Sequence, residues 1–423
     1  MKIYLDSIGC RLNQSEIELF ARQFRAAGHS LVSQAKDADL VVVNTCTVTA
    51  AAASDSRQKI RQAARAGAQQ VIATGCWATL DPQGAAALPN VSQVIPNQAK
   101  DRLVTELLQV SPNIFELEPL LREPLPGAHS RTRAFIKVQD GCDSHCTFCI
   151  TTIARGPGRS RRVTDVLSDI NSALAGGARE IVLTGVHLGS WGKDLSQPLD
   201  LKFLLKTILA ETDIPRLRLS SLEPWQIDEE FLALWKDPRL CPHLHLPLQS
   251  GCAATLRRMG RKIKPQEYAR LLCNARKLIP RIAITTDIIV GFPGEEQAEF
   301  DESMSFVISM DFAGGHVFTY SARAGTAAAR LPNQIPHSIR KVCNAKMRGI
   351  FSESSINYRR SFLGQSLSVL WEKATRVGPK TWQLQGLSDN YLRISAIASE
   401  NPWNTINEVK LTSLTEDGLF GEL

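Results

Sequence analysis

Short apolar runs alternate with amphipathic stretches along most of this 423-residue chain, and the alternation constrains the fold more than any other feature. The strand candidates in the first hundred residues are KIYLDSIGC, LVVVNTC and QQVIATGC. They are of the largely apolar kind typical of parallel strands buried on both faces. Between them, SEIELFARQFRAAG has helical periodicity, with Ser15 as the predicted N-cap and Gly28 at its C-terminal end. Strands and helices in this order predict an α/β fold, with an N-terminal open parallel domain at residues 1–112.

The alternation resumes after residues 110–130, a proline-rich stretch in which we expect a linker. Six strand candidates follow, namely AFIKVQDG, EIVLTGVH, LRLSS, HLHLPLQS, IAITTDIIVGF and GGHVFTYS. Six βα units are fewer than the eight of a closed TIM barrel. We therefore predict a central partial (β/α)6 TIM-like barrel at residues 128–358, ending in a basic helical connector from about 337.

The remainder, residues 361–423, shows short alternating strands and no long helical pattern. This predicts a small C-terminal antiparallel β-barrel. The module carries five basic and seven acidic residues, a net charge of −2, which argues against a grip on nucleic acid by charge alone. Stacking of bases on Trp371, Trp382 or Tyr391 would have to contribute.

The composition indicates the class of protein and its expected location. The 43% hydrophobic and 22% charged residues are those of an ordinary globular protein, and a membrane span or secretion signal is not expected. The expected location is cytoplasmic, where disulfides are rare, so ten cysteines favour metal or redox chemistry. The formal charge of +7 permits a polyanionic partner without requiring one.

Three cysteines stand close together in DGCDSHCTFC, with the spacing C-x3-C-x2-C at Cys142, Cys146 and Cys149. They follow the first barrel strand, where active-site loops lie. A [4Fe–4S] cluster usually takes four thiolates, so three leave one iron open. S-adenosylmethionine can chelate such an iron through its amino and carboxylate groups and is a source of radical chemistry. A zinc site is the alternative, but it usually needs a second cysteine pair, which is missing nearby.

A second set of cysteines ends the three N-terminal strand candidates, at Cys10, Cys46 and Cys76. Ligands of open parallel sheets bind outside the carboxyl ends of the strands, so the three thiols should converge in a second metal site. The alternative is that they are small buried hydrophobes. The remaining cysteines have no spacing logic and are interpreted as structural: Cys241, Cys252, Cys273 and Cys343.

Several barrel loops and strand ends suit an adenosyl cofactor, because their glycines allow close backbone approach and their polar side chains can bind it. The candidate contacts are Gly185, Gly189, Gln249, Ser250, Asp287 and Gly291. Ordinary turn chemistry explains each of them equally well. His243 and His245 share one strand face without a third ligand, and we interpret them as barrel lining.

Basic tracts could contact phosphates. ARGPGRSRR supplies the candidate RNA-binding residues Arg155, Arg159, Arg161 and Arg162. LRRMGRKIK is a second tract, and residues 340–360 carry six basic residues against one acidic. A solvated face is the alternative for each tract.

Taken together, these motifs resemble the radical-SAM methylthiotransferase family over essentially the full length. The resemblance rests on GCRLNQSE, NTCTV, TGC, VQDGCDSHCTFC, ARGPGRSR, SSLEP, HLHLPLQSG, LRRMGRKIK, DIIVGFPGE and HVFTYSARAGTAAAR. It is closest to the branch that acts on N6-threonylcarbamoyladenosine in tRNA. It implies a tRNA-modifying transferase that adds a methylthio group to C2 of that nucleoside at position 37, and a tail similar to an RNA-binding TRAM module.

The resemblance also implies cofactors and partners. Two [4Fe–4S] clusters would be held, one by Cys142, Cys146 and Cys149 together with S-adenosylmethionine, and an auxiliary one by Cys10, Cys46 and Cys76. The first would start radical chemistry and the second would hold or supply sulfur. The implied partners are tRNA and a reductant protein such as a flavodoxin or ferredoxin, and we expect a monomer that does not bind membranes.

A few positions depart from the family pattern. Thr151 and Thr152 stand where relatives commonly have Ile-Pro, Cys252 replaces a usual serine, and Ala324 replaces a proline frequent in relatives acting on isopentenyladenosine. None of these positions is a predicted cluster ligand.

Other functions stay open at this stage. Within the family the substrate could be isopentenyladenosine in tRNA or an aspartate of a ribosomal protein. Outside it, the chain could be a non-catalytic zinc or iron–sulfur RNA-binding protein, or a radical enzyme acting on a small metabolite.

Overall fold

The computed structural model describes residues 1–111, 115 and 132–423. The linker predicted at 110–130 therefore lies outside the described residues, apart from 110, 111 and 115. The chain forms two compact units. The first comprises Met1–Ser144, Ile150–Ala178 and Thr184–Leu199, and the second His145–Cys149, Arg179–Leu183 and Asp200–Leu423. The three domain limits from the sequence stay a prediction.

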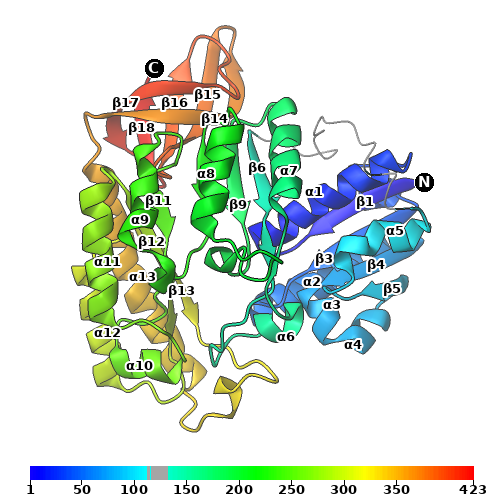
Figure 1. Ribbon diagram of the computed structural model, residues 1–423, viewed down its shortest axis with the longest axis horizontal. Coiled ribbons are helices and arrows are strands. Elements are labelled where there is room, and N and C mark those ends of the chain that lie inside the picture. Colours follow the sequence, from blue (N-terminus) through cyan, green and yellow to red (C-terminus); the bar gives the residue numbers. More distant parts are fainter. Residues whose placement is uncertain (112–114, 116–131) are drawn as a thin grey trace. The chain divides into compact units, whose positions relative to one another are not determined.

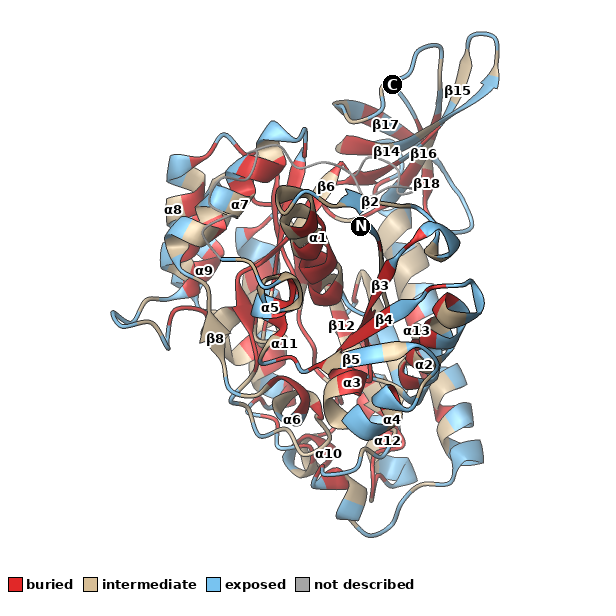
Figure 2. Ribbon diagram, turned by 90° about the vertical axis from the view of Figure 1, so that its right-hand side faces the viewer, coloured by how far each residue is buried: buried red, intermediate tan, exposed pale blue. Residues whose placement is uncertain are grey.

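The first unit contains a five-stranded sheet in which all neighbours are parallel. From edge to edge its strands are β2 (Ser30–Leu31), β1 (Lys2–Ser7), β3 (Leu40–Thr45), β4 (Gln70–Gly75) and β5 (Val91–Ile95). Every residue of β3 is buried, and in Figure 2 this strand and β4 form the inside of the domain. The predicted open parallel N-terminal domain is confirmed.

Helices cover both faces of this sheet (Figure 1). They are α1 (Arg11–Ala26), α2 (Ala50–Arg65), α3 (Cys76–Leu80), α4 (Pro82–Ala86) and α5 (Leu103–Leu108). One face is packed by α1 and α5, with Phe20 and Phe24 in its core. The other is packed by α2, with Ile60 in its core. The domain is thus a three-layer α/β/α sandwich that buries apolar side chains on both faces of its sheet.

The predicted N-cap at Ser15 is wrong. Helix α1 begins four residues earlier, and Cys10 occupies the N-cap with extended backbone. The buried Ser15 hydroxyl donates to the carbonyl of Leu12 within the helix, at 2.8 Å. Gly28, with φ +79°, follows the helix end as predicted.

The first unit also holds the start of the predicted barrel. Its elements are β6 (Arg133–Lys137), β7 (Gln139–Asp140), α6 (Thr151–Arg155), β8 (Arg159–Ser160) and α7 (Val163–Ala175). Strands β7 and β8 pair antiparallel and fold the chain back after the cluster loop.

In the second unit, five strands follow one another as parallel neighbours, β9 (Glu180–Thr184), β10 (Leu217–Leu219), β11 (His243–His245), β12 (Ala283–Val290) and β13 (Gly314–Thr319). The helices between them are α8 (Leu201–Glu211), α9 (Glu229–Leu232), α10 (Ala253–Arg258), α11 (Pro265–Leu278) and α12 (Gln297–Ser309). With β6, all six predicted strands of the partial barrel form.

The chain then continues through α13 (His337–Arg360), the predicted basic connector, into a closed β-barrel. The barrel order is β14 (Ser366–Gly378), β15 (Thr381–Ser388), β16 (Arg393–Ala398), β18 (Leu419–Glu422) and β17 (Ile406–Leu414). Most pairs are antiparallel, as predicted, but β16 and β18 run parallel. Among the described residues, no helix is both long and apolar enough to cross a membrane.

Two of the aromatic residues proposed to stack on RNA bases make contacts within the protein instead. Trp371 is fully buried in the barrel core, so stacking on it is excluded. Tyr391 stacks on His243 of β11, with ring centroids 4.4 Å apart. Beside it, Arg218 of β10 pairs with the buried Glu180 at 2.7 Å and donates to the carbonyl of Asp389 at 2.9 Å. These contacts attach the C-terminal barrel to the partial barrel within the second unit.

Candidate active site

The cysteines at 10, 46 and 76 gather at one edge of the N-terminal sheet. Cys10 caps α1 after β1, Cys46 directly follows β3, and Cys76 opens α3 after β4. These strands are neighbours, and in the order 2-1-3-4-5 the ligand crevice lies where the chain switches direction, between β1 and β3. Burial raises the pKa of the Cys46 thiol, and charge on Cys10 and Cys76 raises it further.

Glycines make this convergence possible. A Cβ on Gly9 would lie 2.5 Å from the Sγ of Cys46, so the loop before Cys10 touches Cys46 directly. Gly75, just before Cys76, has φ +95°, and a Cβ there would lie 2.3 Å from the carbonyl oxygen of Thr45. Larger residues at either position would push the cysteine loops apart.

Two asparagines hold the outer cysteines. The Cys10 thiol donates to Asn13 Oδ1 over 3.8 Å, and Asn13 itself donates to the carbonyl of Thr45 at 3.1 Å. Asn97 Nδ2 donates to the Sγ of Cys76 at 3.6 Å and to the carbonyl of Ala154 at 2.7 Å. Asn97 is therefore a donor that would stabilise a thiolate at Cys76 and fix its direction, whereas Asn13 accepts the Cys10 proton and links its loop to the end of β3.

The donor set indicates the kind of metal group that fits. In the part of the chain that the structure describes, no three Cys, His, Asp or Glu side chains lie close enough to hold a single metal ion. A [4Fe–4S] cluster binds its thiolates on separate irons and therefore spaces them more widely than one ion does. Three thiols around a glycine-lined crevice suit a cluster better than a lone zinc.

The loop with the second triplet begins in the first unit. Gly141 has φ +74°, and a Cβ there would lie 1.8 Å from the carbonyl oxygen of Pro157, so only glycine fits. The amide of Cys142 donates to the carbonyl of Gly156 at 3.0 Å. Its Sγ lies 3.4 Å from the amide of Ser144 and 3.7 Å from Nδ1 of His187. The Ser144 amide donates to this sulfur and would stabilise a cluster-bound thiolate there.

The rest of the loop lies in the second unit, where Arg261 is its main contact. Its guanidinium lies 3.8 Å from the Sγ of Cys146, pairs with Glu223 at 2.7 Å and packs over the ring of Trp225. Burial raises the pKa of the Cys146 thiol, and Arg261 opposes this. The turn is closed by the Cys149 amide, which donates to the carbonyl of Cys146 at 3.1 Å.

LRRMGRKIK is therefore only partly a surface tract. Arg261 is buried, and Arg258 pairs with Glu299. The backbone between them holds the cluster loop, since the Thr147 amide donates to the carbonyl of Met259 at 3.0 Å. A sequence reading by charge alone could not distinguish these inward arginines from solvated ones.

The predicted cofactor residues of the first unit lie near Cys142. Gly185 is packed on Gln139, whose Oε1 would be 3.1 Å from a Cβ at position 185. The same oxygen accepts the amide of His187, so Gln139 joins this loop to β7. Gly189 lies in a single 3-10 turn, Leu188–Ser190.

In the second unit the predicted polar contacts sit on adjoining strands. Gln249 has an unusual positive φ of +78°, and its amide donates to the carbonyl of Asp287 at 2.8 Å. The Asp287 carboxylate lies 3.2 Å from Nε2 of His245. Ser250 is fully buried, and its hydroxyl accepts the amide of Cys252 at 3.2 Å.

Gly291 belongs to a tight turn. Its amide donates to the carboxylate of Glu295 at 2.5 Å, and Arg340 fills the space where its side chain would be. Burial raises the pKa of Glu295 to about 7. The turn accounts for the glycine by itself, and its cofactor contact stays a proposal.

The arginines of ARGPGRSRR divide into inward and outward groups. Arg155 is only 2% exposed and ion-paired with Glu16 and Asp140, so the predicted phosphate contact is wrong for this residue. Arg162 is exposed and Arg159 partly exposed, and both can face a phosphate.

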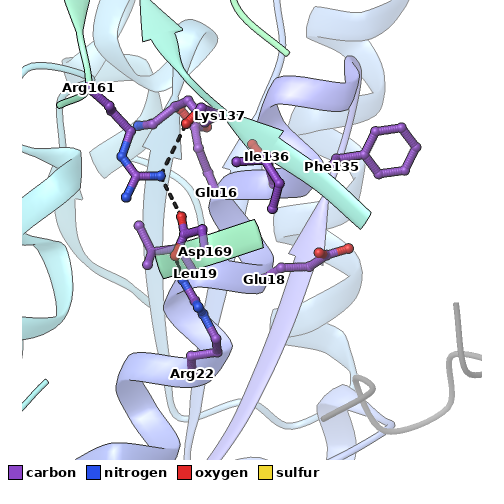
Figure 3. A pocket seen from close by; sticks show the side chains of 10 residues that line it. Glu16, Glu18, Leu19, Arg22, Phe135, Ile136, Lys137, Arg161 and Asp169 are labelled. Carbon is purple, nitrogen blue, oxygen red and sulfur yellow. Dashed lines mark hydrogen bonds and ion pairs between the residues drawn. The ribbon is translucent and has the colours of Figure 1, made fainter. Parts of the chain in front are cut away.

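Arg161 belongs to a half-buried cluster of charged side chains between α1, β6 and α7. Arg161 and Arg22 both bind the carboxylate of Asp169, at 2.5 and 2.6 Å (Figure 3). The cavity beside them measures about 30 Å³, room for one water rather than a substrate.

A run of parallel βα units whose first loop carries C-x3-C-x2-C defines the radical-SAM class of enzymes. Accordingly, the model of the Radical SAM superfamily matches residues 136–307, and that of the uncharacterized protein family UPF0004 matches residues 2–96. A Bacillus subtilis (strain 168) protein named threonylcarbamoyladenosine tRNA methylthiotransferase MtaB is 33% identical, over 96% of this chain and 92% of its own. The chain thus belongs to the radical-SAM methylthiotransferase family, in its MtaB branch.

Two further comparisons place the chain within a wider group. A Geobacter metallireducens protein named tRNA-2-methylthio-N(6)-dimethylallyladenosine synthase is 31% identical over 100% of this chain and 98% of its own. The solved structure of the radical S-adenosylmethionine methyltransferase TsrM from Kitasatospora setae superposes with a TM-score of 0.57 at 15% identity, covering 78% of this chain and 77% of that one. The latter likeness concerns the fold.

The residues that sequence reasoning missed are those that support the cysteines. Asn13 lies in the quoted GCRLNQSE motif, three residues after Cys10, and this spacing on a helix could have suggested it. Gln139 lies in VQDGCDSHCTFC and Glu223 in SSLEP, but their contacts with His187 and Arg261 depend on the tertiary fold. Asn97 lies in none of the quoted motifs.

Proposed function

We propose that this enzyme adds a methylthio group to C2 of N6-threonylcarbamoyladenosine at position 37 of tRNA. It would use S-adenosylmethionine and two [4Fe–4S] clusters, one on Cys142, Cys146 and Cys149 and one on Cys10, Cys46 and Cys76. The observation that carries the proposal is the second cysteine set, converging at the carboxyl ends of β1, β3 and β4. A second thiol site could hold the cluster that supplies the sulfur.

The chain's own residues divide between these tasks. S-adenosylmethionine and its cluster, when bound, supply a radical able to activate an inert C–H bond. Arg261 would offset thiolate charge at Cys146, and the amide of Ser144 would do so at Cys142. Asn97 would orient Cys76 by donating to its sulfur, and Asn13 would hold the Cys10 loop against the end of β3 through the carbonyl of Thr45.

The threonylcarbamoyl substrate is supported by the Bacillus subtilis relative, and isopentenyladenosine is the second candidate, supported by the Geobacter relative. A nucleoside profile of tRNA from a deletion strain separates the two. We expect the methylthio derivative of threonylcarbamoyladenosine to disappear and its precursor to accumulate. The wild-type gene should restore it and a Cys142→Ala gene should not. Loss of methylthio-isopentenyladenosine alone would overturn the choice of substrate.

Reconstitution separates the enzyme from a non-catalytic RNA-binding protein. The anaerobic protein should bind about eight iron atoms, four for each cluster. It should cleave S-adenosylmethionine when reduced. Zinc content without iron, or iron without cleavage, would favour the binding protein.

The proposed partners are tRNA, with Arg159 and Arg162 as exposed candidates for phosphate contact, and a small reductant protein. The proposed state is a monomer in the cytosol. Salt-dependent binding of tRNA that weakens in an Arg159→Gln, Arg162→Gln variant tests the contact.

A further inference from the structure

Arg155, the last residue of α6, is buried where its sequence context suggested a surface arginine. Its guanidinium donates to three acceptors, Asp140 Oδ1 at 2.8 Å, Glu16 Oε1 at 3.0 Å and Asn13 Oδ1 at 2.6 Å. Taking such a charge out of water costs several kcal/mol unless partners compensate for it. A surface position for the same arginine would avoid that cost.

The third acceptor connects Arg155 to the N-terminal cysteines. Asn13 Oδ1 also accepts the thiol of Cys10, so one amide oxygen lies between the guanidinium and the sulfur. Arg155 and the Cys10 and Cys76 thiols are close enough to influence one another, since thiolate charge on either raises the pKa of Arg155. The arginine is thus a neighbour of the proposed auxiliary cluster.

Buried charges around Arg155 do not cancel. Within the described part of the chain, this network joins the buried cations Arg155, Lys100 and Lys137 to two buried carboxylates, Glu16 and Asp140. Two partly exposed groups join the same network, the carboxylate Asp101 at Lys137 (2.7 Å) and the cation Arg159 at Asp140 (3.5 Å), and their charges cancel each other. The buried part therefore carries one positive charge in excess.

An anion beside the network would balance that charge. Three thiolates on a [4Fe–4S]²⁺ cluster sum to a charge of −1, and the reduced cluster carries one more negative charge. A nearby buried cation stabilises the reduced form more than the oxidised form, because Coulomb energy grows with the charge at low dielectric.

We propose that Arg155 is a positioning residue of the auxiliary cysteine site, which holds the Asn13 amide beside Cys10 and raises the reduction potential of the cluster bound there. This inference rests on the cluster proposed at Cys10, Cys46 and Cys76. The same guanidinium holds Asp140, whose carboxylate accepts the amide of Gly141 at 2.8 Å, just before Cys142. One arginine therefore supports the loops of both cysteine sites in the first unit.

The test uses the full chain with Cys142, Cys146 and Cys149 changed to alanine, so that only the auxiliary site can bind iron. In this background Arg155→Gln removes the charge, and Arg155→Lys keeps it. Arg65→Gln is the matched control, because it removes one exposed arginine of the first unit at the end of α2 that lies farthest from Cys46. After anaerobic reconstitution, iron is counted and the midpoint potential is measured by a redox titration followed by electron paramagnetic resonance.

We expect Arg155→Gln to lower the midpoint potential, Arg155→Lys to stay near the parent, and Arg65→Gln to leave it unchanged. Glu16→Gln removes a negative charge from the same network and should shift the potential in the opposite direction. Opposite shifts in the two variants distinguish an electrostatic effect on the potential from damage to the fold. If Arg155→Gln fails to hold iron, a raised potential in Glu16→Gln still tests the inference.

Equal potentials in the parent, Arg155→Gln and Glu16→Gln proteins would overturn the inference and leave the second cluster intact. Shifts in the same direction for Arg155→Gln and Glu16→Gln would also overturn it. A parent protein that binds no iron would instead refute the second cluster of the proposed function, and the inference with it.

Discussion

The guanidinium of Arg261 lies 3.8 Å from the Sγ of Cys146 and 2.7 Å from the carboxylate of Glu223, so a buried cation bridges a predicted cluster ligand and the SSLEP segment. Replacing a residue that orients a metal ligand typically lowers metal affinity or activity by about 10- to 100-fold. That loss corresponds to about the free energy of one hydrogen bond to a charged group.

Arg261→Gln should therefore lower S-adenosylmethionine cleavage by about 10- to 100-fold, since the Cys146 thiolate loses its nearest cation. Arg257→Gln, which alters an exposed arginine of the same segment, is the control and should retain cleavage. The measurement is 5′-deoxyadenosine released per bound cluster. Equal rates in both variants would remove Arg261 from the site.

Gly141→Ala should abolish iron binding at the radical-SAM loop. Its positive φ costs an L-residue about 1–2 kcal/mol, and the new Cβ would collide with the carbonyl oxygen of Pro157. We expect about four iron atoms per chain in place of about eight. Gly349→Ala is the matched control, because nothing lies within 4 Å of its Cβ in helix α13. That change should raise stability by up to about 1 kcal/mol.

The raised pKa of Glu295 predicts that the free energy of unfolding falls as the pH rises. Burial raises the pKa of its carboxyl from 4.5 to about 7, so the folded state binds the proton more tightly than the unfolded state. The loss of unfolding free energy is absent below about pH 4.5 and grows as the pH rises to about 7. Above that pH it stays constant, at about 3 kcal/mol at most.

Glu295→Gln should remove that dependence. The difference between wild-type and variant unfolding free energies, followed by urea titration from pH 4.5 to 8, isolates this group from histidines that titrate in the same range. A constant difference across the window would contradict the raised pKa.

The ion pair of Arg218 and Glu180 predicts a strong coupling. Both side chains are fully buried, so Arg218→Met leaves the Glu180 carboxylate with only the more distant Arg216, at 4.0 Å, as an ion-pair partner and should cost about 3–5 kcal/mol. Glu180→Met on the same background should recover much of the loss. A double-mutant cycle by chemical denaturation measures the coupling, and additive single effects would exclude it.

Faster proteolysis between α13 and β14 should accompany Arg218→Met, because Arg218 also holds the carbonyl of Asp389.

Hydrophobic periodicity and the spacing of motifs were enough to predict much of this fold from the sequence. The six barrel strands, the parallel N-terminal sheet and the cysteines at its strand ends could all be predicted, because each depends on neighbours in the sequence or on one strand–helix repeat. The burial of Arg155, Arg261 and Trp371 could not be predicted. The partners of Arg155 lie 15 to 142 residues away and those of Arg261 lie 14 to 115 residues away, and Trp371 is buried by the closure of a barrel. The start of α1 at Arg11 was missed because its N-cap is a cysteine, not one of the usual capping residues.

The central claim is that two cysteine sites divide radical initiation from sulfur transfer. The most direct measurement incubates reconstituted Cys10→Ala, Cys46→Ala, Cys76→Ala protein with S-adenosylmethionine, a reductant and tRNA that carries threonylcarbamoyladenosine. The 5′-deoxyadenosine and the methylthio nucleoside are then quantified by mass spectrometry. We predict that this variant still cleaves S-adenosylmethionine and forms no methylthio nucleoside, whereas the wild type forms both products. Formation of the methylthio nucleoside at the wild-type level would contradict the account.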